Sequence, residues 1–145
     1  MGAGCGLARQ QEAQAKAAAL QVQHKAALQG CDEKVPSGNP KTTVARAQCI
    51  NAAIGILRPL VPYPDLLDLT QAHLLAAAER VEKGQLTIAQ ASELIAQKNS
   101  EIAAEEQRRN LANRAVAAQE GVAAANLMAA GPRSCTRYGN TVNCF

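Results

Sequence analysis

The cysteines are the residues whose type and spacing most directly suggest chemistry. The chain has five of them, so one must lack a partner if the others pair. Thiols form disulfides in oxidising compartments, whereas reduced cysteines act as nucleophiles or metal ligands. Their positions give two close pairs and one remaining residue: Cys31 with Cys49, Cys135 with Cys144, and Cys5.

The tail from Cys135 to Cys144 has the spacing of a disulfide-closed β-hairpin. Gly139 and Asn140 suit the two central positions of a type II′ turn, which places Cys135 opposite Cys144. Counting outward from the turn, the cysteines fall on a non-hydrogen-bonded pair, where Cα atoms lie about 4.5 Å apart. Since that separation is within disulfide range, we predict this bond.

Cys31 and Cys49 are predicted to join two successive helices, because Gly30 looks like a helix C-cap and Cys49 lies in the next helical pattern. Such a closure is worth about 3 kcal/mol in the chain-entropy model. The alternative is a metal site, but neither His24 nor His73 lies near a Cys-x-x-Cys motif, which does not occur in the chain. We therefore expect two structural disulfides, no metal, and a periplasmic, cell-surface or secretory compartment.

Cys5 ends the run Ala3-Gly4-Cys5, which resembles the last three residues of a bacterial lipobox. That resemblance implies lipid attachment at Cys5, a signal peptide removed from the mature protein, and a bacterial envelope location. Gly6 is not the aspartate that retains such lipoproteins at the inner membrane, so the resemblance implies an outer-membrane destination, facing the periplasm or the cell surface.

Two alternatives for Cys5 stay open. One is a free thiol in a flexible start. The other is myristoylation at Gly2 with palmitoylation at Cys5, but that motif requires Ser or Thr where this chain has Gly6.

Composition argues against several functional classes. The net charge is +3, the basic residues are scattered, and aromatic residues make up 2% of the chain, so a nucleic-acid surface is not expected. No P-loop, dinucleotide fingerprint, Gly-x-Ser-x-Gly or His-Glu-x-x-His motif occurs. We expect neither enzymatic activity nor a cofactor, and we expect His24 and His73 to be surface or half-buried residues of helices.

Helices are the elements that must position these residues. Alanine, the best helix former, occupies 31 positions. Apolar residues at spacings of three and four predict four helices, over about 7–29, 40–57, 65–82 and 87–129.

Asn39-Pro40 looks like a cap followed by a proline in the first turn of the second predicted helix. The ends of the last two predicted helices also carry clear signals. Pro64 suits a first turn, Lys83-Gly84 ends a helix, and Thr87 with Gln90 forms a capping box. The predicted fold is all-α: a three- to four-helix bundle with one long C-terminal helix and a small disulfide-closed β-hairpin tail. Its divisions are a flexible lipid-anchor segment over 1–6, a helical domain over 7–130 and the tail over 131–145.

As a whole, the chain is similar to uncharacterised small exported lipoproteins of alphaproteobacteria. The likeness lies in four stretches: 61–67, 78–87, 105–109 and 135–144. No activity is implied by it.

Two functional hypotheses follow. The first is a lipid-anchored envelope protein with a structural or protein-interaction role, which contacts an envelope partner, or a second copy of itself, through the long helix or the tail. The alternative is a helical small-ligand or lipid-binding module of the periplasm. Its pocket would lie between the second, third and fourth helices and be lined by Ile54, Leu57, Leu66, Leu74 and Ile95.

Overall fold

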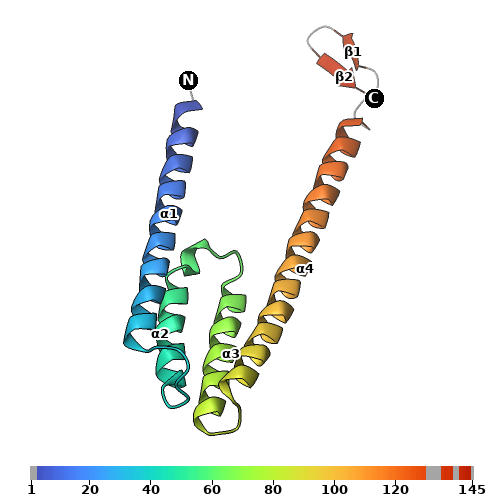
Figure 1. The fold of residues 1–145 in the computed structure, drawn as a ribbon. Helices are drawn as coiled ribbons and strands as arrows, with labels where there is room; N and C mark the ends of the chain where they lie inside the picture. The colour runs from blue at the N-terminus through green and yellow to red at the C-terminus, as the bar shows by residue number, and fades with distance from the viewer. Residues whose placement is uncertain (1–2, 130–134, 139–140, 145) are drawn as a thin grey trace. The chain divides into compact units, whose positions relative to one another are not determined.

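A computed structural model describes residues 3–129, 135–138 and 141–144, and the side chains of residues 4–126. This part of the chain contains four α-helices, a short 3-10 helix and two strands (Figure 1). Their bounds are α1 Ala3–Lys34, α2 Thr43–Gly55, η1 Arg58–Leu60, α3 Pro64–Glu82, α4 Ile88–Ala129, β1 Cys135–Tyr138 and β2 Thr141–Cys144. The prediction of a helical protein with a long last α-helix is therefore confirmed.

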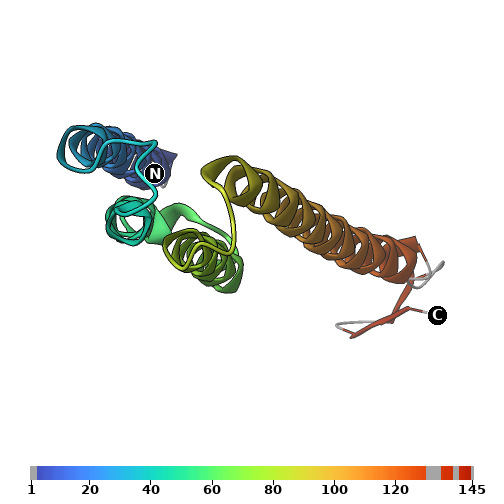
Figure 2. The ribbon, with the colours of Figure 1, turned by 60° about the horizontal axis from the view of Figure 1, so that its bottom comes forward.

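The chain divides into two compact units, Met1–Ala104 and Glu105–Phe145, and the division falls within α4. In the first unit α1 packs on α2 and α2 packs on α3 (Figures 1 and 2). The first turns of α4 pack on the last turns of α3, where Ala77, Val81 and Ala91 form a buried cluster.

The core of the first unit is built from small side chains. Eight residues are buried among those described: Cys31, Ala47, Ala53, Leu66, Ala77, Ala78, Val81 and Ala91. Five of the eight are alanines, which allow the helices to approach closely but bury little area each. The core of the first unit is therefore thin.

Hydrogen bonds set the antiparallel register of α2 and α3. The Thr43 hydroxyl donates to the Ala78 carbonyl oxygen at 3.0 Å. Further along, the amide groups of Asn51 and Gln71 donate to each other's backbone carbonyls, at 3.0 Å and 2.9 Å. The first half of α2 therefore lies beside the second half of α3.

The predicted ends of α3 and α4 are confirmed. Pro64 begins α3, and Gly84 beyond its end has a positive φ of 73°. The Thr87 hydroxyl accepts from the Gln90 backbone N–H at 3.1 Å, and the Gln90 side chain accepts from the Thr87 N–H at 2.9 Å. These reciprocal bonds satisfy N–H groups that a helix start otherwise leaves unpaired.

The prediction that Gly30 ends the first helix is wrong. α1 begins at Ala3, passes through Gly30 and ends at Lys34. The effective stop is Pro36, which disfavours the helical conformation in the residue before it, Val35. Glycine weakens a helix interior by only about 1 kcal/mol, so packing on α2 can override it.

The prediction that Asn39 caps the second helix is also wrong. The Asn39 side chain accepts from the Lys41 N–H at 3.0 Å, and its carbonyl accepts from the Thr42 N–H at 3.2 Å. These bonds form a turn, and α2 starts only at Thr43. Asn and Asp make such local turns as readily as they make caps, which the sequence pattern does not distinguish.

β1 and β2 pair antiparallel, with Cys135 opposite Cys144 and Tyr138 opposite Thr141. The predicted turn at Gly139 and Asn140 lies outside the described residues, as do the two cysteine side chains. The disulfide-closed hairpin therefore stays a prediction.

Candidate functional site

The predicted disulfide between Cys31 and Cys49 is present and joins α1 to α2. The two Cα atoms are 5.8 Å apart, and Cys31 is 2% exposed. Close by, the Arg46 guanidinium donates to the Val35 carbonyl and to the Asp32 carboxylate, each at 2.7 Å. This disulfide and these bonds hold the α1–α2 corner, so neither thiol is available for metal or redox chemistry at this site.

Cys5 is exposed, near the amino end of α1, and its thiol is free. The helix around it makes no buried contact: residues 4–16 are all exposed. A group attached to this sulfur would therefore meet no steric barrier from the described residues.

The two histidines are separated and have different environments. His24 is half-buried, and its Nδ1 lies 2.8 Å from the Ala53 carbonyl oxygen of α2, which gives it a structural role. His73 lies on α3 and faces α4, at the edge of a hollow described below. The structure thus does not bring the histidines together.

A cavity of about 300 Å³ lies between α2, α3 and α4 in the first unit. We name it the α2–α3–α4 cavity. Its apolar lining comes from all three helices: Ala47 and Ile50 of α2, Leu74, Ala78 and Val81 of α3, and Ile88, Ala91 and Ile95 of α4. Its polar lining residues are Ser37, Asn39, Thr43, Arg46 and Ser92, with Gly38 beside them.

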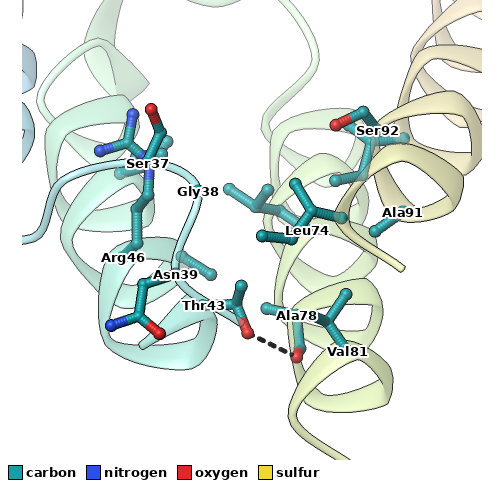
Figure 3. A pocket seen from close by; sticks show the side chains of 14 residues that line it. Ser37, Gly38, Asn39, Thr43, Arg46, Leu74, Ala78, Val81, Ala91 and Ser92 are labelled. Atoms are coloured by element: carbon teal, nitrogen blue, oxygen red, sulfur yellow. Dashed lines mark hydrogen bonds between the residues drawn. The ribbon is translucent and has the colours of Figure 1, made fainter. Parts of the chain in front are cut away.

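Two of the polar residues that line this cavity, Thr43 and Arg46, already make hydrogen bonds within the protein. Figure 3 shows the Thr43 hydroxyl bonded to the Ala78 carbonyl below the labelled Leu74. The Arg46 guanidinium donates hydrogen bonds to Val35 and Asp32, so the part of Arg46 that lines the cavity is its aliphatic stem. The exposed Ser37, Asn39 and Ser92 leave polar groups only at the mouth.

The predicted pocket lining is correct in part. Leu74 and Ile95 line the α2–α3–α4 cavity, but Ile54, Leu57 and Leu66 are not among its lining residues. The reason is register. The loop between α3 and α4 is short, so α4 starts beside the last turns of α3, and these face the first turns of α2. The end of α2 and the start of α3 lie at the other end of their contact.

A second cavity, of about 230 Å³, lies between α3 and α4. Its lining is His73, Ala76, Ala77, Arg80, Leu94, Ile95 and Lys98. This group of residues was not predicted from the sequence. The signal was available, since 73, 76, 77 and 80 share one face of a helix and 94, 95 and 98 share another. The sequence does not show, however, that these two helix faces oppose each other.

Among the described residues, Glu105 at the start of the second unit has the pKa that is shifted furthest from its ordinary value. It accepts from Arg108 at 2.7 Å and 2.8 Å and from Arg109 at 2.8 Å. These hydrogen bonds lower the pKa of the Glu105 carboxyl to about 2. The carboxylate is thereby committed to two arginines, which argues against a role as a general acid or base.

No group of three or more metal-ligating side chains occurs within the described residues. Among the helices that the structure describes, none is both long and apolar enough to cross a bilayer. Comparison with protein-family models, with curated proteins and with solved structures finds no match for this chain.

Proposed function

We propose that this protein binds a small, neutral, apolar molecule in the α2–α3–α4 cavity. The observation that carries the proposal is the cavity itself, about 300 Å³ between three helices with mostly apolar walls. That volume is at the lower end for ligand pockets, so it suits one small molecule or one end of a longer chain.

A neutral ligand is favoured by the absence of an uncommitted charge in the lining. Among the described residues that line this cavity, Arg46 is the one that carries a charge, and it is already paired with Asp32. An anion would have to compete with that carboxylate, whereas an apolar group needs only to displace water from the alanine, leucine and isoleucine walls.

The test is binding of the neutral dye N-phenyl-1-naphthylamine, whose fluorescence rises in apolar surroundings. Ala78→Leu adds side-chain volume inside the cavity and should weaken dye binding at least about tenfold, because ligand and leucine compete for one space. Ala72→Leu is the matched control: it makes the same change on an exposed face of α3 and should leave binding unchanged.

A second filling variant guards against misfolding. Ser92→Leu fills the cavity from its exposed mouth and should not disturb the buried core. Dye binding that is equal in wild type, Ala78→Leu and Ser92→Leu would overturn the proposal. So would no saturable binding by folded wild type.

We also propose that the protein is lipid-anchored through Cys5 in a bacterial envelope compartment. Two observations favour this candidate: the exposed free thiol of Cys5 near the start of α1, and the Cys31–Cys49 disulfide, which is typical of oxidising compartments. Anchoring and ligand binding are compatible, since Cys5 and the cavity lie on different elements.

The anchor is tested by fractionating cells that make the protein with its native upstream region. Cys5→Ala should move it from the membrane to the soluble fraction, whereas Cys31→Ala should leave it at the membrane if it folds. Membrane association that survives Cys5→Ala contradicts the anchor and leaves the ligand proposal untouched.

A second disulfide, in the tail, would also be typical of an oxidising compartment. Cys135 and Cys144 occupy facing positions of β1 and β2, and we propose that they form a second disulfide. Intact mass under native redox conditions should fall two hydrogens short of the reduced chain for each disulfide. A deficit for one disulfide only, with alkylation at Cys135 and Cys144, would contradict this bond.

A further inference from the structure

We propose that the second cavity, between α3 and α4, binds a small anion that has a short apolar body. His73, Arg80 and Lys98, whose side chains carry nitrogen atoms that can donate hydrogen bonds, line this cavity. Its apolar lining, which we call its floor, includes Leu94 and Ile95. This combination suits a carboxylate or phosphate group attached to a few carbons. The inference is independent of the ligand proposed above, since the two cavities share only Ile95.

Helix geometry explains why these side chains converge. His73, Ala77 and Arg80 lie at spacings of four and three, so they share one face of α3. Leu94 and Lys98 are four residues apart on α4 and face the same hollow. Because α3 and α4 are joined by a short loop, the two faces oppose each other and their long basic side chains border one space.

Arg80 differs from three other arginines in the described part of the chain, each of which pairs with an acidic side chain. Arg46 pairs with Asp32, Arg58 with Asp68, and Arg108 with Glu105. Within the described residues, no hydrogen bond or ion pair engages the Arg80 guanidinium. Its five N–H donors are therefore free to bind an oxyanion, which a guanidinium does in bidentate fashion.

Lys98 can contribute a second contact. Its Nζ lies 3.0 Å from a Glu101 carboxylate oxygen on the same helix. This pair is partly exposed and therefore weak, and an ammonium group has three donors, so Lys98 can bind a ligand while keeping Glu101. The ligand must then carry negative charge, because the cavity contains more basic groups than acidic ones.

The size of the cavity limits the apolar part of the ligand. A volume of about 230 Å³ is below the range of drug-sized pockets, which excludes a long acyl chain held entirely inside. The apolar lining comes from Ala76, Ala77, Leu94 and Ile95, so the ligand body would lie mainly on the larger side chains of Leu94 and Ile95.

Hexanoate, hexanol and inorganic phosphate are the probes that separate these contributions. Binding is followed by NMR, through the methyl signals of Leu94 and Ile95 and the Nε–H of Arg80. Hexanoate should bind with an affinity in the millimolar range and more tightly than either hexanol or phosphate, because only hexanoate uses both the charge and the apolar floor. Equal binding of hexanoate and hexanol would overturn the proposal, as would equal binding of hexanoate and phosphate.

Variants assign the charge contacts. Arg80→Gln should weaken hexanoate binding about tenfold, the loss expected for one charge-assisted hydrogen bond, and Lys98→Gln should weaken it less. Arg108→Gln is the matched control on an exposed surface and should bind as wild type. Unchanged binding by both Arg80→Gln and Lys98→Gln overturns the proposal.

Two further arms identify the source of the anion and separate this site from the first. If hexanoate does not bind but Arg80→Gln weakens sedimentation with phosphatidylglycerol vesicles, the basic residues serve a membrane surface and the small-molecule proposal is wrong. Ala78→Leu, which fills only the α2–α3–α4 cavity, should leave hexanoate binding unchanged. Loss of hexanoate binding in that variant, with its fold intact, would contradict a separate site.

Discussion

α3 and the stretch 110–126 of α4 are both helical and rich in small residues, yet they differ in burial. In α3, Ala77 and Ala78 are 2% and 6% exposed. In the stretch of α4 every residue is exposed, including Leu111 at 57% and Val116 at 54%. Alanine content therefore produces a helix in both places, whereas burial needs more than small and apolar residues in the helix itself, because Leu111 and Val116 stay exposed.

The neighbours explain the difference. Leu74 and Val81 continue the face of Ala77 and Ala78 on α3 and meet Ile95 of α4. Between residues 110 and 126, charged residues interrupt the apolar positions at Arg114 and Glu120. The free energy of unfolding of the first unit should therefore depend on a few packed residues. The stability of the helix over 110–126 should depend on its own backbone hydrogen bonds.

The largest expected effect comes from the disulfide. Replacing both Cys31 and Cys49 with alanine should lower the free energy of unfolding by about 3 kcal/mol, because the bond closes a separation of 18 residues. Urea denaturation followed by circular dichroism measures it. Cys5→Ala is the control, since that thiol is exposed and unpaired. Equal stability of both variants would show that α1 is held by packing alone.

The next largest effect is expected from shortening a buried leucine in α3, compared with an exposed leucine in α4. Leu66→Ala removes a side chain that is 7% exposed and should cost about 2 kcal/mol, at the low end for buried leucines because the core is thin. Leu111→Ala makes the same change at an exposed position and should stay within about 0.5 kcal/mol of wild type. Similar losses for the two variants would mean that Leu111 has a partner in solution, as an oligomer through α4 requires.

The capping box at the start of α4 should have a smaller effect. Thr87→Ala removes the oxygen that accepts from the Gln90 N–H and should cost about 1 kcal/mol. Thermal unfolding measures it, with Thr42→Ala as the comparison, because Thr42 makes no side-chain cap bond to α2. If Thr42→Ala is the more damaging change, the junction of α3 and α4 is not held by this box.

The smallest effect concerns the exposed helix around Glu105. Its pKa is lowered to about 2, so its contribution to helix stability is present above the ordinary carboxyl pKa of 4.5 and is lost as the pH falls towards 2. A titration of the Glu105 side-chain carbon by NMR should have its midpoint near 2. In Arg108→Gln the midpoint should rise, and a midpoint that stays at the ordinary value in wild type would contradict the pairing.

The helices, the Cys31–Cys49 bond and several helix ends could be predicted from the amino-acid sequence alone. The disulfide was predicted from the spacing of the cysteines, whereas the helices and their ends depend on local signals: alanine content, a proline at a first turn, a glycine after Lys83 and the pair Thr87 and Gln90. Each acts within a few residues, so no knowledge of the rest of the chain is needed. Gly30 and Asn39 were misread because their local signals are also compatible with a helix interior and a turn.

The positions of the two cavities, in contrast, depend on how the helices pack and could not be predicted from the sequence. The sequence placed Leu74 and Ile95 in a pocket but also assigned Ile54, Leu57 and Leu66 to it, and it left His73, Arg80 and Lys98 unconnected. A cavity exists where faces of different helices oppose each other, and that depends on register. The short loop after α3 and bonds such as that from Thr43 to Ala78 set this register between residues far apart in the chain, which no local pattern records.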